Sequence, residues 1–119
     1  MKNLLILVII LLLSACGDQT IRQDKPQYSG LQQAEQYFDG QMYNKAARAY
    51  EHLFMNYKED IFALKAADSW MRIKQFQNAQ NLIDSIKISQ NTLYLLIQSE
   101  LYVNAQKSDA ALRTFNQIP

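Results

Sequence analysis

The stretch YNKAARAYEHLF at residues 43–54 decides the fold, because it recurs twice downstream in weaker form. FQNAQNLI at residues 76–83 is the second copy, and SDAALRTF at residues 108–115 is the third. Each copy has a small residue followed four positions later by a large one; the pairs are Ala46/Tyr50, Ala79/Ile83 and Ala111/Phe115. Residues four apart share one face of a helix, so each copy predicts a helix that presents both to the same neighbour.

A second pair precedes each copy at a fixed distance. Twelve residues before each small residue stands another small one, with an aromatic three positions after it; these pairs are Ala34/Tyr37, Ala67/Trp70 and Ser99/Tyr102. The gap leaves room for a helix end, a tight turn and a new helix, so each unit predicts two antiparallel helices. Such units must stack to bury their apolar faces.

The pattern resembles the tetratricopeptide repeat family, in which small-x-x-aromatic and Ala-x-x-x-aromatic signatures recur about every 34 residues. The spacings here are 33 and 32 residues, and the family's Leu-Gly dipeptide and terminal Pro are missing. The resemblance implies an all-α fold, an α-solenoid of about three antiparallel helix hairpins over residues 28–119. A generic helical bundle with Ala-rich interfaces is the alternative.

The expected helices follow from this period. We place them at residues 30–39, 43–56, 61–73, 76–88, 91–104 and 108–119. Residue types favoured at helix starts predict caps at Ser29, Asp60, Asn91 or Thr92, and Ser108. Gly40 suits the turn after the first helix.

The N-terminus has the pattern of an export signal. Lys2 is followed by an unbroken apolar run at residues 4–13, about half the length that a membrane-spanning helix needs. The sequence Leu-Ser-Ala-Cys-Gly at residues 13–17 resembles the lipobox of bacterial lipoproteins. The resemblance implies that residues 1–15 are a signal peptide and that Cys16 is lipidated. An ordinary secreted protein is the alternative.

Residues 16–27 are expected to form the lipidated Cys and a flexible tether, because they are polar and lack apolar periodicity. In Gram-negative lipoproteins an Asp directly after the Cys favours the inner membrane, and here that position is Gly17. The resemblance therefore implies an outer-membrane protein, lipid-anchored on the periplasmic side. In a Gram-positive source the location would be the cell surface or cell membrane.

In the resembled family the first helix of each hairpin lines a concave groove that binds a partner. The positions implied here are Tyr28, Leu31, Glu35, Phe38, Ile61, Leu64, Asp68, Met71, Leu93, Leu96, Glu100 and Val103. They predict an apolar groove with an acidic line, suited to an amphipathic or basic segment of another protein. Alternatively, the apolar residues are inter-helix packing and the acids a solvated edge.

The last helix raises a separate question. Leu112, Phe115 and Ile118 would lie on an end helix that no further repeat covers. The helix either turns them inward or presents a docking or self-association surface, or else the chain is shorter than its relatives.

Catalysis is not expected. His52 is the single His, and the three glycines form no phosphate-binding loop. With Cys16 lipidated, no metal cluster can be built, and we expect no cofactor. The net charge is +1, and no basic stripe predicts a nucleic-acid partner.

The resemblance thus implies a membrane-anchored periplasmic protein-binding scaffold. The lipoproteins that share this plan favour an accessory factor for pilus or secretion-system assembly, with proteins of that envelope machine as partners. A regulator of a cell-wall synthase and a self-associating structural lipoprotein are the alternatives.

Overall fold

The computed structural model describes residues 27–87 and 90–119. Within these ranges all regular structure is helical, as the sequence predicted, and no strand is present. The helices are α2 (Leu31–Asp39), α3 (Tyr43–Tyr57), α4 (Asp60–Arg72), α5 (Phe76–Asp84), α6 (Thr92–Asn104) and α7 (Ser108–Phe115). The predicted signal peptide, Cys16 and the tether up to residue 26 lie outside the described residues.

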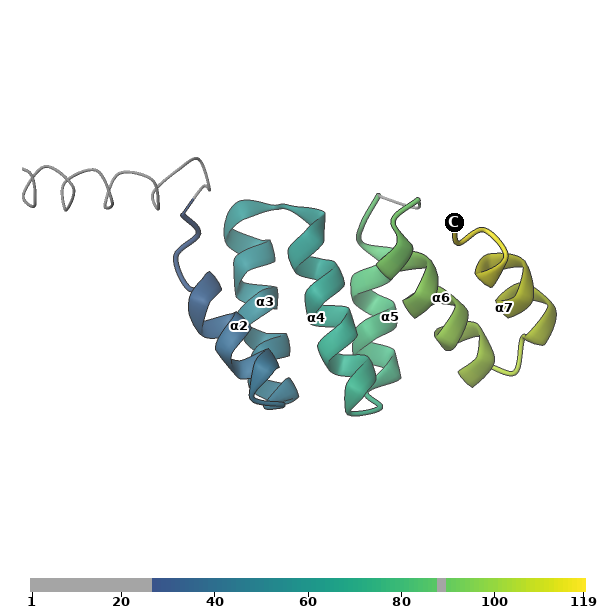
Figure 1. Ribbon diagram of the computed structural model, residues 1–119, viewed down its shortest axis with the longest axis horizontal. Coiled ribbons are helices and arrows are strands. Elements are labelled where there is room, and N and C mark those ends of the chain that lie inside the picture. The colour runs from purple at the N-terminus through teal and green to yellow at the C-terminus, as the bar shows by residue number, and fades with distance from the viewer. Residues whose placement is uncertain (1–26, 88–89) are drawn as a thin grey trace, which may run out of the picture.

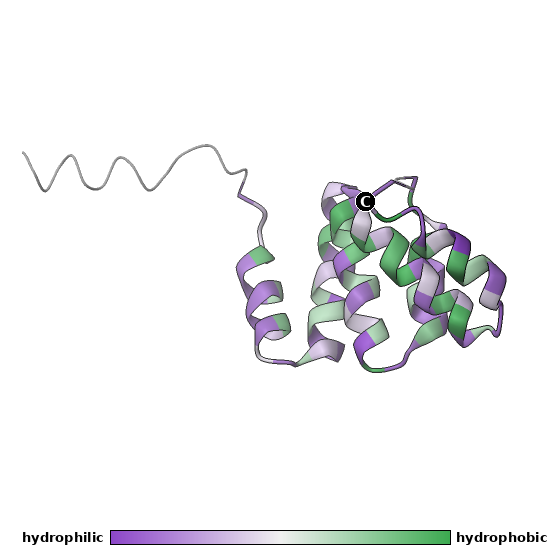
Figure 2. Cartoon of the chain, turned by 45° about the vertical axis from the view of Figure 1, so that its right-hand side comes forward, coloured by the Kyte–Doolittle hydropathy of each residue, from purple (hydrophilic) through white to green (hydrophobic). Residues whose placement is uncertain are grey.

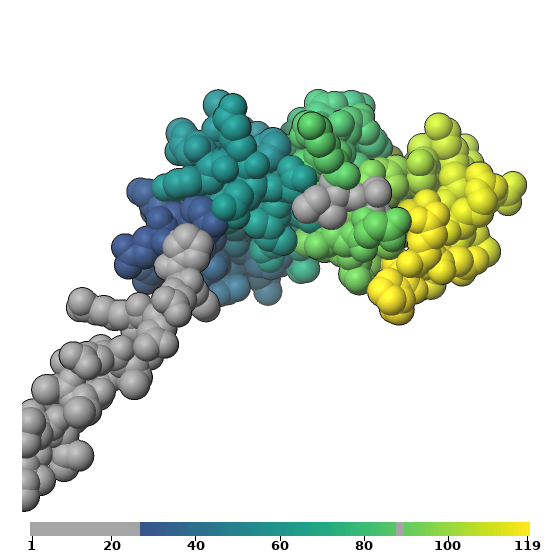
Figure 3. Space-filling view, turned by 90° about the horizontal axis from the view of Figure 1, so that it is seen from above, coloured from purple at the N-terminus to yellow at the C-terminus, as the bar shows by residue number. Residues whose placement is uncertain are grey.

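The helices lie in a row in which each packs against the next along the chain (Figure 1). Contacts also join α4 to α6, the first helices of successive hairpins. Seen from above, the colours follow one another along the molecule from the N-terminal to the C-terminal end (Figure 3). Contacts are therefore mainly between neighbours in sequence, which leaves the two ends of the row as distinct surfaces.

The three hairpins are closed by the same backbone turn. Gln41, Lys74 and Gln106 each have a φ of 60°, in the left-handed region. In each turn the following residue donates its N–H back over the helix end: Met42 to the Tyr37 carbonyl at 2.8 Å, Gln75 to Trp70 at 2.9 Å and Lys107 to Tyr102 at 2.8 Å. This is the Schellman arrangement, which satisfies carbonyls that a helix end leaves without partners.

The small residues of the repeated pairs lie inside the row of helices. All six are buried: Ala34, Ala46, Ala67, Ala79, Ser99 and Ala111. Two clusters of buried side chains form around the first two hairpins, one containing Tyr50 and Phe62, the other containing Trp70, Ile83 and Ile97. Side chains larger than these small residues would hold the helices apart, so the recurring small residue fixes the spacing of the row.

Several helix boundaries differ from the prediction. α5 ends at Asp84 and α7 at Phe115, earlier than expected. Of the predicted caps, only Asn91 caps a helix through its side chain, accepting from the N–H groups of Leu93 at 2.8 Å and Tyr94 at 3.3 Å.

The other three predicted caps were wrong. Gly30, Glu59 and Lys107 stand at the cap positions in place of Ser29, Asp60 and Ser108. Asp60 and Ser108 instead open the first turns of α4 and α7, because the chain enters each helix one residue earlier than the preferred cap type suggests.

Candidate protein-binding surface

The predicted groove positions divide into core and surface. Leu64 and Met71 are buried in the cluster around Trp70, so their assignment to a surface groove was wrong. α4 contacts α3, α5 and α6, and this central position covers residues that the same spacing leaves accessible on end helices. Exposed members are Glu35, Ile61, Leu96, Glu100 and Val103, and partly buried members are Tyr28, Leu31, Phe38, Asp68 and Leu93.

The expected acidic line is interrupted by basic side chains. Arg72 Nε lies 3.3 Å from Asp68 Oδ1, one turn away on α4. Lys65 Nζ lies 4.1 Å from the centre of the Phe38 ring, and the Arg72 guanidinium lies 4.9 Å from it. Cations over an aromatic face are attracted to it. The surface shared by α2 and α4 therefore carries both signs of charge around an aromatic, and we call these five residues (Glu35, Phe38, Lys65, Asp68 and Arg72) the mixed-charge face.

The pKa of Tyr50 reports how the acids gather here. Burial raises the pKa of Tyr50 to about 12, and the charges of Glu35, Asp39 and Asp68 act in the same direction. Burial disfavours the charged phenolate, and nearby carboxylates repel it. Carboxylates from α2 and α4 thus lie close enough to act on one buried hydroxyl.

A second surface lies at the C-terminal end of the row. Leu96, Ser99, Glu100 and Val103 of α6 and Ala111, Leu112 and Phe115 of α7 line a hollow of about 330 Å³, which we call the end groove. Eight large apolar side chains are exposed within the described residues, and four of them line this hollow. Such a concentration of exposed apolar side chains marks an interaction site more often than chance.

The repeat indicates what the end groove lacks. Phe115 is 58% exposed, whereas its repeat equivalents Tyr50 and Ile83 are 2% and 1% exposed. In the first two hairpins the first helix of the next hairpin provides the cover: Phe62 of α4 is in the cluster of Tyr50, and Ile97 of α6 is in that of Ile83. Among the described residues no helix takes that place beside α7. Of the three sequence alternatives, the inward orientation is therefore excluded for Leu112 and Phe115, whereas Ile118 is partly buried.

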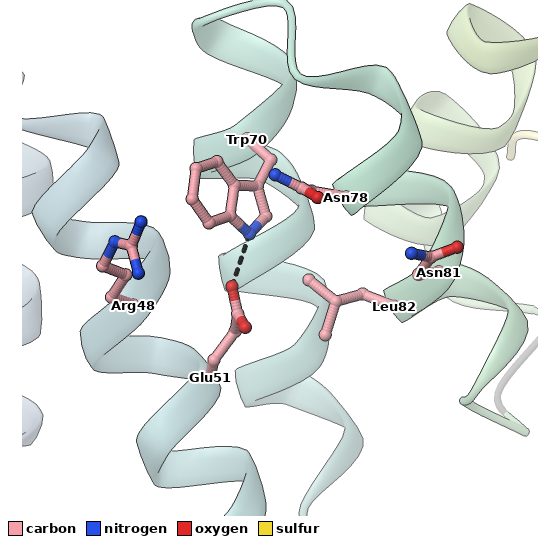
Figure 4. A pocket seen from close by; sticks show the side chains of 6 residues that line it. All are labelled: Arg48, Glu51, Trp70, Asn78, Asn81 and Leu82. Carbon is pink, nitrogen blue, oxygen red and sulfur yellow. Dashed lines mark hydrogen bonds between the residues drawn. The ribbon is translucent and has the colours of Figure 1, made fainter.

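A separate, polar cavity is lined by residues of α3, α4 and α5. It has a volume of about 390 Å³ and is lined by Arg48, Glu51, Trp70, Asn78, Asn81 and Leu82 (Figure 4). The indole N–H of Trp70 donates to Glu51, and the guanidinium of Arg48 lies 5.9 Å from the Trp70 ring centre. The Glu51 carboxylate thus satisfies the N–H of the buried indole.

The remaining sequence candidates lie apart from these sites. His52 is exposed on α3. In residues 27–87 and 90–119, no three His, Cys, Asp or Glu side chains are placed to hold a metal ion. None of the helices described there has the length and hydropathy needed to span a bilayer.

The chain matches no family model, no curated protein and no solved structure. Its function is therefore inferred from the geometry and chemistry of its own surfaces.

Proposed function

We propose that this protein is a lipid-anchored scaffold, a tetratricopeptide-like solenoid that binds another protein at the periplasmic side of the outer membrane. The observation that carries the proposal is the single hairpin turn that recurs at Gln41, Lys74 and Gln106. Stacked hairpins of one geometry build an extended face, and proteins of this architecture use such faces to bind partners.

The mixed-charge face supports this role. Phe38 is partly buried and lies against cations from the next hairpin, and Glu35 beside it is exposed. A surface that joins an aromatic to both signs of charge suits a polar or amphipathic protein segment, and charge complementarity would give it specificity. Neither a purely basic nor a purely acidic partner is favoured, which revises the expectation from the sequence.

The lipid on Cys16 would fix the location, and the face would select the partner. We propose a protein of a pilus or secretion-system assembly machine as that partner. Radioactive palmitate should label the natural chain and fail to label Cys16→Ser; equal labelling of both would contradict the anchor.

Crosslinking in intact cells, followed by mass spectrometry of the captured proteins, tests the scaffold. We compare the natural chain with the double variant Glu35→Lys/Arg72→Glu, and use Lys87→Glu as a matched control because Lys87 is exposed elsewhere. Envelope-assembly proteins should be captured by the natural chain and the control, and at least tenfold less by the double variant. Capture of a cell-wall synthase, or equal capture by all three chains, would contradict the proposal.

A further inference from the structure

We propose that the end groove is covered by a second copy of this chain, in a closed two-fold dimer in which the two α7 helices pack against each other in antiparallel orientation. Such a dimer is independent of the partner that the mixed-charge face binds. The proposal rests on three observations: the exposed apolar side chains of α7, the polar side chains of α2 at the other end of the row, and the balanced charges around the end groove.

The surface of the end groove resembles an interface in composition. Four of the seven residues that line it are large and apolar, and the other three are Glu100 and the small residues Ser99 and Ala111; the large ones are Leu96, Val103, Leu112 and Phe115. Val103 is 64% exposed, although its repeat equivalent Met71 is 8% exposed and lies in a core cluster, and Leu112 is 63% exposed. Ser99 and Ala111 are already buried, so the four exposed apolar side chains provide the contact surface.

The N-terminal end of a copy cannot fill this groove. α4 packs against the first hairpin through Phe62 and Ala66, which share a cluster with Tyr50. The equivalent residues of α2 are Ser29 and Gln33, and both are exposed. The neighbouring Gln32 and Gln36 are exposed as well, and α2 is mostly hydrophilic in colour (Figure 2). Head-to-tail stacking would therefore bury glutamines against leucines, so copies should not grow into a filament.

The C-terminal end does offer a suitable helix. Leu112 and Phe115 are three residues apart on α7 and form an exposed apolar stripe on one face. Of the exposed large apolar side chains outside the end groove in the described residues, Met55 and Tyr57 lie two residues apart on α3 and so face different ways, and Met42 and Ile61 stand at the starts of α3 and α4. Within this chain, α7 is thus the helix whose exposed stripe matches the apolar walls of the end groove.

The charges near the groove permit such self-association. From α6 to the end of α7 the charged side chains are Glu100, Lys107, Asp109 and Arg113, two of each sign, so two copies do not repel each other through net charge. Asp109 and Arg113 lie one turn apart on α7. In an antiparallel pair of α7 helices centred near Ala111 and Leu112, Asp109 of each copy faces Arg113 of the other, an isologous pairing.

The available area fits a dimer of moderate strength. Four side chains exposed to this degree present on the order of 400 Å² of apolar surface per copy. Since slightly more than half of an ordinary interface is non-polar, a dimer would bury roughly 1,400 Å² in total, within the range of specific interfaces.

Cysteine crosslinking of the full chain in its native membrane tests the proposal. Leu112→Cys places a thiol close to the expected two-fold axis, and Met55→Cys is the matched control because Met55 is 72% exposed on α3, away from the groove. After mild oxidation, Leu112→Cys should give a reducible band of twice the chain mass, at least tenfold stronger than Met55→Cys or the natural chain with Cys16 alone.

Charge reversal provides a second arm in the Leu112→Cys background. Arg113→Glu places like charges opposite each other and should reduce the dimer band at least tenfold, whereas Asp109→Arg/Arg113→Asp should restore it. Circular dichroism of each variant confirms that the helices persist. Absence of the band, a band insensitive to both charge changes, or an adduct with a different polypeptide would overturn the proposal, and none of these results bears on capture by the mixed-charge face.

Discussion

The first and last hairpins contain the same paired residues but bury them to different degrees. In the first hairpin Ala46 is buried and Tyr50 is covered by α4, whereas in the last hairpin Ala111 is buried and Phe115 is exposed. The small residue packs against its own hairpin, and the large one needs the next hairpin. In each pair, therefore, the small residue is buried within its own hairpin, and the large residue is buried only when another hairpin follows.

The two ends of the row also differ in the polarity of their exposed side chains. α2 presents glutamines outward, which suits an end in contact with water, while α7 presents Leu112 and Phe115. In the solenoid that we propose, a polar outer face would ordinarily close each end. The contrast between a covered and an uncovered hairpin can therefore be measured. The expected changes in the free energy of unfolding are largest for truncation of a core side chain and smallest for a glycine placed in a left-handed turn.

Truncating Ile83 and Phe115, which hold equivalent positions, should give the largest difference. Ile83→Ala leaves a cavity in a core cluster and should lower the free energy of unfolding by about 3 kcal/mol. Phe115→Ala should change it by less than about 0.5 kcal/mol in dilute solution, where a dimer is dissociated. Urea unfolding of both variants measures the contrast, and equal losses would mean that Phe115 is covered in the isolated chain.

Alkaline pH should weaken the covered unit through Tyr50. Its folded pKa of about 12 lies above the ordinary value of 10.0, so the folded chain disfavours the phenolate. The associated stability is present below pH 10 and is lost as the pH rises through 12, by about 3 kcal/mol in all. Unfolding curves across this range should be less pH-dependent in Tyr50→Phe, and an unchanged profile would contradict the assignment to Tyr50.

Removing the cap of α6 should have a smaller effect. Asn91→Ala deletes the acceptor for the N–H groups of Leu93 and Tyr94 and should cost about 1 kcal/mol. Lys107→Ala, at the start of α7, is the control, because Lys107 makes no side-chain cap there. Thermal unfolding compares the two, and Asn91→Ser should retain most of the stability.

The smallest expected effect is a gain. Lys74→Gly relieves a left-handed backbone, which costs an ordinary residue about 1–2 kcal/mol; after the greater freedom of unfolded glycine is counted, about 0.5–1 kcal/mol should remain. Gln75→Gly is the control, since its φ of −89° needs no glycine. Gln106→Gly should stabilise equally if the last hairpin unfolds together with the rest, and a smaller gain would indicate that it opens alone.

The period of the repeat could be predicted because it depends on small residues. A residue at a helix crossing must be small for the backbones to approach, and this requirement is visible in sequence at Ala34, Ala67 and Ser99 as well as in the second helices. Gly40 marked the first turn, but the left-handed position itself carried no signal, since Gln41, Lys74 and Gln106 stand where glycine would be expected. Their conformation is imposed by the hydrogen bonds that close the hairpin.

The binding surface was less predictable than the fold. Helical spacing placed Leu64 and Met71 on the same face as Leu96 and Val103, but exposure depends on how many neighbours a helix has. The sequence did contain a signal for the missing cations, because Lys65 and Arg72 stand three positions before and four positions after Asp68. An acid so placed between basic residues on one helix face is expected to be neutralised.

Because α7 buries few side chains, association of two copies can be detected without a mutation. α7 has eight residues and buries only Ala111 and Thr114. Amide hydrogens in such a segment exchange with solvent through local fraying, ahead of those in α3 or α4. Any molecule that binds the folded helix must slow that exchange in proportion to occupancy. Protection of the α7 amides as chain concentration rises would thus report the affinity of one copy for another directly.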